Sequence, residues 1–276
     1  MRFGFVTAVQ LGLGCLEEIY DVGGDVDFLM TLRDDIARDK SGRVYLDDFA
    51  AQHGVPLHKI RNINDPEAVE AIRESGLDWL FIIGWSQIAR ADVLEAPTRG
   101  CIGMHPTLLP KGRGRASIPW AIIKDLKETG VTMFQLDEGV DTGPILGQRV
   151  IPIARSETAT TLYDKVSRAH RLLMRDEFTR LQRGKSQPVP QDESKATYWP
   201  ARVPADGQLV PTMTLGAMDR LVRATTHPYP GAFVDQPDGT RLTVWAGAMN
   251  DAGSETGLPI TATNGTYWAI DTAVRS

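Results

Sequence analysis

The stretch Asp78-Trp-Leu-Phe-Ile-Ile-Gly84 holds five consecutive apolar residues between an acidic residue and a glycine. A strand that faces solvent on one side usually alternates apolar and polar residues, whereas a strand buried on both faces is continuously apolar. Continuous apolarity is typical of a parallel sheet that helices cover on both sides. We therefore predict a central strand of such a sheet at residues 78–84.

Segments on the N-terminal side of this stretch alternate between strand-like and helix-like patterns. Strands are expected at residues 1–8, 27–31 and 56–60, and helices at residues 46–53 and 66–74. This alternation predicts an α/β domain with a mainly parallel sheet and flanking helices. Ligands of such sheets bind outside the carboxyl ends of the strands, so the loops there are the first candidates for a functional site.

The C-terminal part of the chain has a different pattern. After an amphipathic helix at residues 159–184, the 187–211 segment collects five prolines among polar residues, which is a linker composition. One more helical stripe around Leu221 and short strands near residues 231–235, 242–245 and 266–270 follow. We predict a catalytic domain at residues 1–200 and a small β-rich domain at residues 201–276.

Composition argues against a protein that binds nucleic acid, a metal ion or a membrane. A net charge of -5 offers no basic surface for nucleic acid, so a transfer-RNA substrate is disfavoured. Cys15 and Cys101 lie far apart, in no metal-type spacing, and read as buried thiols in a reducing compartment. Apolar runs are too short for a membrane span, and the N-terminus has no signal-peptide pattern. We expect a cytoplasmic protein without a metal site or a membrane contact.

Two stretches carry candidate chemistry. In the first, Gly100-Cys-Ile-Gly-Met-His-Pro-Thr-Leu-Leu-Pro-Lys-Gly-Arg-Gly-Arg115, His105 ends an apolar strand and precedes a loop rich in proline and glycine. In the second, a strand at residues 130–136 leads into Asp137-Glu-Gly-Val-Asp-Thr-Gly143. A carboxylate beside an imidazole orients the ring and stabilises its protonated form, as a general base requires. The competing interpretations are a core histidine and turn-forming carboxylates.

The two stretches together resemble the folate-dependent formyltransferase family. Its Gly-x-x-x-x-His-Pro-(Ser/Thr)-Leu-Leu-Pro motif matches residues 100–110, and its Asp-x-Gly-x-Asp-(Thr/Ser)-Gly motif matches residues 137–143, with His105 and Asp141 36 positions apart. The resemblance implies a Rossmann-like core, N-formyltransferase activity and 10-formyltetrahydrofolate as co-substrate. It carries over His105 as general base and acid and Asp141 as its support, without a covalent intermediate.

One member of the family's catalytic set is absent from this chain. An asparagine belongs two residues before the histidine, and Gly103 stands there instead. A preorganised donor for the oxyanion of the tetrahedral adduct is worth roughly 3 kcal/mol. Either another group supplies that donor, such as protonated His105, a backbone N–H or a water molecule, or the enzyme is weakened. We favour a replacement donor, by analogy with sugar-modifying members of the family.

The resemblance also suggests binding residues. The folate is expected to contact two segments, with core packing as the alternative for Trp85. Arg113 and Arg115 are expected to hold a phosphate or carboxylate of the acceptor, with a solvated basic loop as the alternative. Arg33, Arg38 and Lys40 offer a second phosphate contact. The residues expected at the folate are Trp85, Ser86, Gln87, Ile88, Leu136, Asp137, Glu138 and Val140.

The short tail with few lysines favours a small amine acceptor over a transfer RNA. Its Tyr198-Trp-Pro200 and His227-Pro-Tyr-Pro-Gly231 segments resemble those of sugar-nucleotide N-formyltransferases. We expect a nucleotide-linked amino sugar, of use in polysaccharide biosynthesis, and allow for a homodimer. The alternatives are an amino-acid or hydroxylamine acceptor, a formyltetrahydrofolate hydrolase that uses water in place of the amine, and an inactive binding module.

Overall fold

The computed structural model describes residues 1–37, 42–249 and 254–275. The chain forms two compact units, and each is built from several segments. The first unit comprises residues 1–113, 130–150 and 167–197, and the second comprises residues 114–129, 151–166 and 198–276. Arg38 and Lys40, expected to contact a phosphate, lie outside the described residues.

A seven-stranded sheet has the order β3-β2-β1-β4-β5-β7-β8. Neighbouring strands from β3 to β5 run parallel, and β7 runs antiparallel to β5. The fold class predicted from the sequence, a mainly parallel α/β sheet, is confirmed. The strands are β1 (Phe3–Val6), β2 (Phe28–Leu32), β3 (Leu57–Ile60), β4 (Trp79–Ile82), β5 (Gly100–His105), β7 (Glu128–Gln135) and β8 (Ile145–Pro152).

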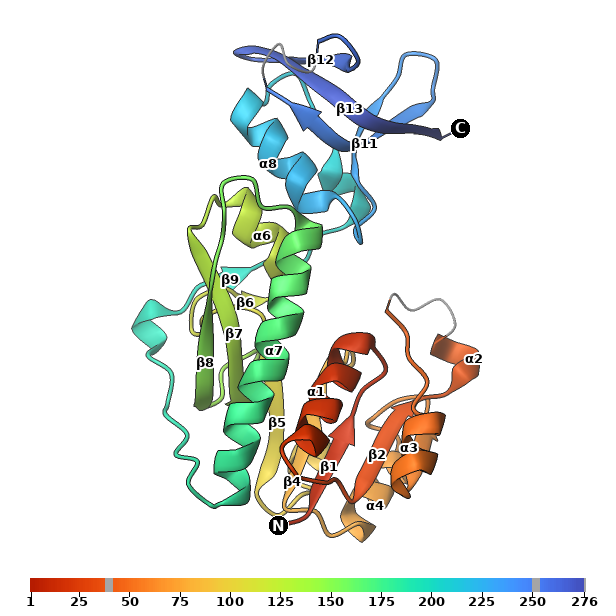
Figure 1. Ribbon diagram of the computed structural model, residues 1–276, viewed down its shortest axis with the longest axis vertical. Helices are drawn as coiled ribbons and strands as arrows, with labels where there is room; N and C mark the ends of the chain where they lie inside the picture. Colours follow the sequence, from red (N-terminus) through yellow and green to blue (C-terminus); the bar gives the residue numbers. More distant parts are fainter. Residues whose placement is uncertain (38–41, 250–253, 276) are drawn as a thin grey trace. The chain divides into compact units, whose positions relative to one another are not determined.

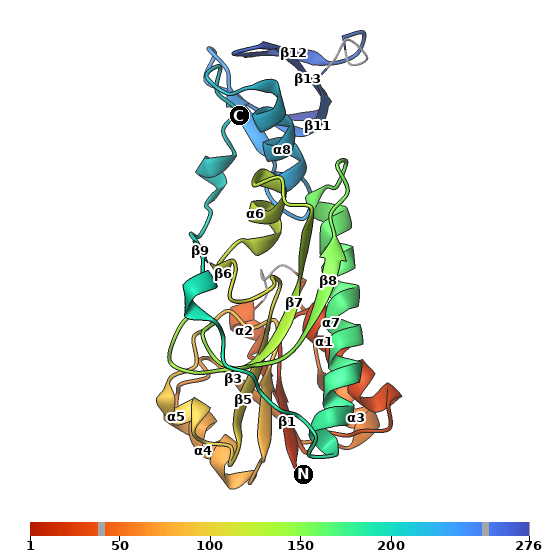
Figure 2. The same cartoon turned by 90° about the vertical axis from the view of Figure 1, so that its left-hand side faces the viewer.

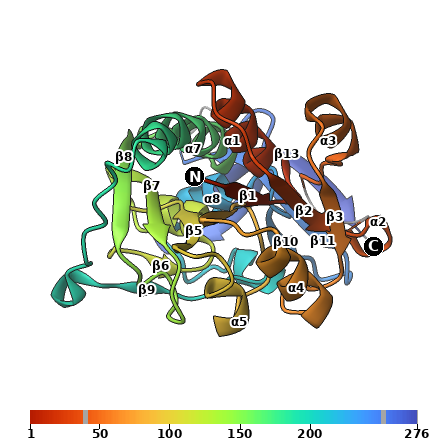
Figure 3. The same cartoon turned by 90° about the horizontal axis from the view of Figure 1, so that it is seen from below.

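Helices cover both faces of this sheet (Figures 1 and 3). On one face, α4 (Pro66–Glu74) and α5 (Ala91–Leu94) share a core with apolar side chains such as Val6 and Leu80. On the other face lie α1 (Gln10–Asp21) and the part of α7 (Ala159–Gln182) that belongs to the first unit. Phe178 of α7 contacts the rings of Phe3 and Phe81 there. Burial on both faces accounts for the continuous apolarity of residues 79–83.

Elements of the second unit include a four-stranded antiparallel sheet of order β10-β11-β13-β12. The strands are β10 (Ala232–Asp235), β11 (Arg241–Ala248), β12 (Leu258–Ala262) and β13 (Gly265–Arg275). Helix α8 (Leu215–Thr225) packs on this sheet through a core that includes Leu221, Val244 and Tyr267 (Figure 2). The predicted β-rich character of the tail is confirmed, while a domain boundary at residue 200 stays a prediction.

Shorter elements complete the described chain. They are α2 (Asp34–Ala37), α3 (Asp47–His53), α6 (Ser117–Ile123), β6 (Arg113–Gly114), β9 (Tyr198–Trp199) and two 3-10 turns at Glu193–Lys195 and Pro204–Gly207. The sequence pattern missed α6, β8 and β12, together with the short elements α2, α5, β6 and β9. In the described part of the chain no helix is long and apolar enough to span a membrane, and no cluster of side chains fits a metal ion.

Glu177 on α7 is nearly fully buried, and burial raises the pKa of its carboxyl above the ordinary 4.5. The folded state therefore holds this proton more tightly than the unfolded state, so the contribution of Glu177 to stability falls as pH rises above about 4.5. We expect Glu177→Gln to gain stability relative to the wild type between pH 5 and pH 8, by a few tenths to about 1 kcal/mol after solvent screening. Urea unfolding at both pH values measures this gain. Glu70→Gln, at an exposed helical glutamate, is the control and should show no such trend.

Candidate active site

His105 is the last residue of β5, which runs parallel to β4, and the residue is 7% exposed. Its Nε2 lies 2.8 Å from the carbonyl oxygen of Gly112. A carbonyl oxygen only accepts hydrogen bonds, so Nε2 must carry a proton. In the neutral ring the basic lone pair is then on Nδ1. The local structure thus selects the tautomer and leaves Nδ1 as the atom that can take a proton.

The Gly112 carbonyl is itself held by a segment distant in sequence. Gly112 N donates to Thr197 Oγ1 at 2.9 Å, and Arg113 N donates to the carbonyl oxygen of Thr197, also at 2.9 Å. The loop after His105 is therefore fixed on both sides of the carbonyl that orients the ring. Thr197 is a contributor that no local sequence pattern indicated.

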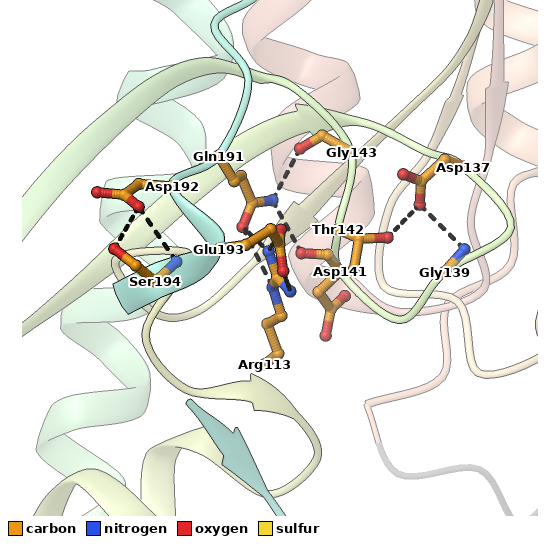
Figure 4. Close-up of polar contacts among 10 residues, drawn as sticks. All are labelled: Arg113, Asp137, Gly139, Asp141, Thr142, Gly143, Gln191, Asp192, Glu193 and Ser194. Carbon is orange, nitrogen blue, oxygen red and sulfur yellow. Dashed lines mark hydrogen bonds and ion pairs between the residues drawn. The ribbon is translucent and has the colours of Figure 1, made fainter. Parts of the chain in front are cut away.

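Asp141 lies in the loop between β7 and β8, and its Oδ2 is 3.6 Å from His105 Nδ1. The predicted pair is thus brought together in the first unit. Asp137 closes the same loop, since its Oδ1 accepts from Gly139 N at 3.1 Å and from Thr142 Oγ1 at 2.6 Å (Figure 4). Asp141 has a φ of 57°, in the left-handed region that non-glycine residues seldom adopt. Such a conformation persists only where surrounding contacts hold it.

Gly103 lies beneath Leu136, the residue that follows β7. Side chains alternate along a strand, so Gly103 and His105 of β5 face the same side of the sheet. A Cβ at Gly103 would lie 2.6 Å from Leu136 Cδ2, which means that Leu136 covers the glycine. Leu136 also donates its N–H to the carbonyl oxygen of Cys101 at 2.8 Å. Leu136 therefore extends the pairing of β7 with β5 by one residue, and the loop that follows it brings Asp141 Oδ2 to 3.6 Å from His105 Nδ1.

Arg113 is fully buried in the first unit and does not extend into solvent. Its guanidinium makes a two-pronged contact with Glu193, at 2.5 and 2.9 Å, and donates to Gln191 Oε1. Hydrogen bonding from Arg113 holds the pKa of the Glu193 carboxyl below its ordinary value. These partners occupy nitrogens that the sequence interpretation assigned to a substrate anion. A substrate role for Arg113 stays a prediction, as it does for Arg115, whose side chain is exposed.

Comparison with known proteins identifies the family of this chain. The family model described as formyl transferase matches residues 31–176. A methionyl-tRNA formyltransferase of Lachnospira eligens is 31% identical over 257 residues, which cover 92% of this chain and 81% of that protein. The chain belongs to the formyl transferase family. It is a folate-dependent N-formyltransferase, and 10-formyltetrahydrofolate is the co-substrate of its family, as the resemblance implied.

Solved structures show the same fold. A sugar N-formyltransferase from Shewanella sp. FDAARGOS_354 aligns with a TM-score of 0.72 at 22% identity, covering 88% of this chain and 96% of the other. WlaRD, a sugar 3N-formyltransferase whose crystal structure was obtained in the presence of dTDP and 5-N-formyl-THF, aligns with a TM-score of 0.70 at 16% identity, covering 99% and 97%. At these sequence identities, the two similarities show a shared fold and nothing further.

Two segments of this formyltransferase were expected to contact the folate. In the first, Gln87 is engaged within the protein, because its side chain donates to Arg61 O and accepts from Ile63 N. The neighbouring Ile88 is 79% exposed, and Trp85 packs partly buried against the core. The segment is thus anchored by Gln87 and presents an apolar side chain to solvent, which fits a ligand with an aromatic ring.

The second segment, residues 136–140, likewise has some groups that bond within the protein and others that are exposed to solvent. The N–H groups of Leu136 and Gly139 are used inside the protein. Val140 is 54% exposed, Glu138 is exposed, and the Asp137 side chain closes the loop. The folate contacts of both segments stay predictions. We expect any hydrogen bonds from the pterin to go to main-chain groups other than those two N–H groups.

The family's asparagine has no room at position 103 in this formyltransferase. We expect Gly103→Asn to destabilise the protein by about 1–3 kcal/mol, because the new side chain must displace Leu136. We also expect it to lower turnover rather than restore a donor. Urea unfolding and steady-state kinetics measure both effects. The double variant with Leu136→Ala opens the space and should recover part of the stability; a single Gly103→Asn variant faster than the wild type would contradict the prediction.

Proposed function

We propose that this formyltransferase transfers a formyl group to the amine of a nucleotide-linked amino sugar, with His105 as proton acceptor and donor. The tautomer of His105 is the observation that carries the catalytic part of the proposal. Nε2 is committed to Gly112 O, and Nδ1 faces Asp141 in a nearly buried position. A base near the reacting amine needs this combination of a fixed ring and a nearby carboxylate.

The reaction proceeds by addition and elimination. As the acceptor nitrogen bonds to the formyl carbon, His105 Nδ1 takes a proton from that nitrogen. The tetrahedral adduct then breaks its bond between the formyl carbon and N10 of the folate, and the same proton passes from Nδ1 to N10. Tetrahydrofolate and the formamide leave, and His105 is neutral again. Asp141 stabilises the positive charge on the ring between the two steps.

The adduct's oxygen needs a donor, and Gly103 supplies none. Protonated His105 is one replacement, since Nδ1–H is a donor directed away from Gly112 once the first step has occurred. A backbone N–H or a water molecule at the site is the other. The Leu136 side chain packs where the Cβ of the missing asparagine would lie, which leaves less room for a water molecule there and favours the histidine.

The charge of the C-terminal part favours a small acceptor. After residue 200 the chain has five arginines, no lysine and seven acidic residues. Binding of a transfer RNA depends on many phosphate contacts from lysine and arginine, and a segment with a net negative charge supplies few. A nucleotide-linked sugar has only a diphosphate to hold, for which Arg115 is an exposed candidate.

Transfer to methionyl-tRNA is the second candidate, because the Lachnospira eligens relative is named for that activity. A panel assay separates the two. The protein is incubated with 10-formyltetrahydrofolate and, in separate reactions, amino-sugar nucleotides, amino acids, hydroxylamines, methionyl-tRNA or buffer alone, and tetrahydrofolate release is followed.

Release that depends on an amino-sugar nucleotide supports the proposal, and Arg115→Met should then raise the KM for that acceptor. Release only with methionyl-tRNA would replace the sugar with the transfer RNA. Equal release in every reaction, including buffer alone, would identify a formyltetrahydrofolate hydrolase. No release in any reaction would favour the inactive binding module.

A further inference from the structure

Residues 189–197, part of the proline-rich segment that composition assigns to a linker, are hydrogen-bonded to both loops that carry the His105–Asp141 pair. Val189 and Ile145 exchange N–H···O bonds of 2.8 Å in both directions, next to the end of the Asp141 loop. Thr197 holds Gly112, whose carbonyl orients His105. The segment therefore spans the active site instead of only leading away from it.

Gln191 makes the central contacts of this segment. Its Nε2 donates to the carbonyl oxygens of Asp141, at 2.9 Å, and Gly143, at 2.7 Å. Its Oε1 accepts from Arg113 Nε at 3.2 Å and Nη2 at 2.8 Å (Figure 4). The amide NH2 group thus donates to two carbonyl oxygens, and the amide oxygen accepts from two nitrogens of Arg113.

The orientation of the Gln191 amide follows from Arg113. A guanidinium only donates hydrogen bonds, so the amide oxygen must face it, and the NH2 group must then face the two carbonyl groups. Arg113 is in turn fixed by its two-pronged contact with Glu193. The chain of contacts runs from Glu193 through Arg113 and Gln191 to the main chain of Asp141.

This chain of contacts ends at a residue with an uncommon backbone conformation. Asp141 adopts a φ of 57°, which a non-glycine residue keeps only under external restraint. Hydrogen bonds to the carbonyl groups of residues 141 and 143 fix the peptide planes around it. A rotation of this backbone would turn the Asp141 carboxylate away from His105 Nδ1.

We infer that Gln191 is a positioning residue for formyl transfer, which holds the Asp141 carboxylate against His105 through the main chain of the loop. The inference rests on the proposed roles of His105 and Asp141. It assigns a function to a residue 50 positions from Asp141 and 78 from Arg113, in a segment whose composition is that of a linker.

The test compares Gln191→Met with Gln187→Met. Gln187 is an exposed glutamine in the same segment, so the two variants differ in the contacts that are lost. We expect Gln191→Met to lower kcat by roughly 10- to 100-fold, the usual cost of a catalytic group displaced by about 1 Å, with a change in the KM for 10-formyltetrahydrofolate of less than about threefold. Gln187→Met should match the wild type. Unchanged kcat in Gln191→Met would overturn the inference.

A double-mutant cycle separates positioning from general support of the fold. If Gln191 acts through the Asp141 carboxylate, then Gln191→Met costs nothing further in an Asp141→Asn background, measured by single-turnover kinetics. A loss of the same size in both backgrounds would overturn the inference. Gln191→Glu is the second variant, for the case that Gln191→Met does not fold. It keeps the length and the acceptor for Arg113 but replaces the NH2 donor with a charged oxygen that the carbonyl groups of Asp141 and Gly143 repel, so it should lose kcat as well. Gln187→Glu adds the same charge at an exposed position and is its control.

Hydrogen exchange of the main chain gives a readout that does not depend on the reaction. Amides of residues 137–143 should exchange at least about tenfold faster in Gln191→Met than in Gln187→Met, because the loop loses both hydrogen bonds from the amide. Unchanged exchange would overturn the inference even if turnover fell. If the wild-type protein transferred no formyl group to any acceptor, the proposed function would fail, and this measurement would still decide whether Gln191 holds the loop.

Discussion

Replacing His105 with asparagine should lower kcat for formyl transfer by roughly 10²- to 10⁴-fold, the range that positioned proton transfer contributes to catalysis. Asparagine can still donate a hydrogen bond toward Gly112, but it has no basic nitrogen to take the proton of the attacking amine. The KM for 10-formyltetrahydrofolate should change little, because the folate is expected to bind through main-chain groups elsewhere. Steady-state and single-turnover kinetics measure the two parameters separately.

The same assay separates the contribution of the His105 ring to kcat from that of the Asp141 carboxylate. Asp141→Asn preserves the shape of the loop and removes only the negative charge, so its kcat should fall less than that of His105→Asn, on the order of 10²-fold. His53→Asn, at an exposed histidine of α3, is the control for an arbitrary histidine replacement and should match the wild type. Near-native turnover in either His105→Asn or Asp141→Asn would remove the proposed mechanism.

Much of the sheet follows from local sequence pattern. The apolar run at residues 78–84 predicted the central strand correctly because burial on both faces leaves a signature within a few residues. The 66–74 helix was predicted at its exact bounds, since Pro66 at its first turn marks where it starts. His105 was likewise recognisable at a strand end before a proline-rich loop, and the structure brings it within 3.6 Å of Asp141.

Contacts between distant segments left no such signature. Gln191 and Thr197 lie in a polar, proline-rich stretch whose composition is that of a linker, and their partners are about 50 to 85 positions away. Arg113 looks like a solvated cation in a glycine-rich loop until Glu193 is placed beside it. The direction of β7 was also not evident, because the alternating pattern of residues 130–136 fits a strand of either direction.

Gly143→Ala should lower kcat by roughly 10²-fold or more, because the backbone leaves no space for a methyl group at this position. A Cβ there would lie 1.8 Å from the carbonyl oxygen of Gln135, which no side-chain rotation relieves. Gln135 N donates to Pro144 O at 2.9 Å, so the two ends of the loop are tied together next to the clash. The main chain of residues 136–143 must therefore shift, and the Asp141 carboxylate shifts with it.

Gly139→Ala provides the matched comparison for this backbone effect. Its added Cβ would lie 2.0 Å from Thr142 Oγ1 and 3.0 Å from Thr142 Cβ, so the threonine side chain must rotate and shift by a few tenths of an ångström, but no backbone atom blocks it. That rotation breaks the hydrogen bond from Thr142 to Asp137 but leaves the contacts of Gln191 with Asp141 and Gly143 in place. Gly139→Ala should therefore lose less turnover than Gly143→Ala, about tenfold at most. Equal losses in the two variants would mean that the Asp137 closure, and not the Gln191 contacts, determines where Asp141 lies.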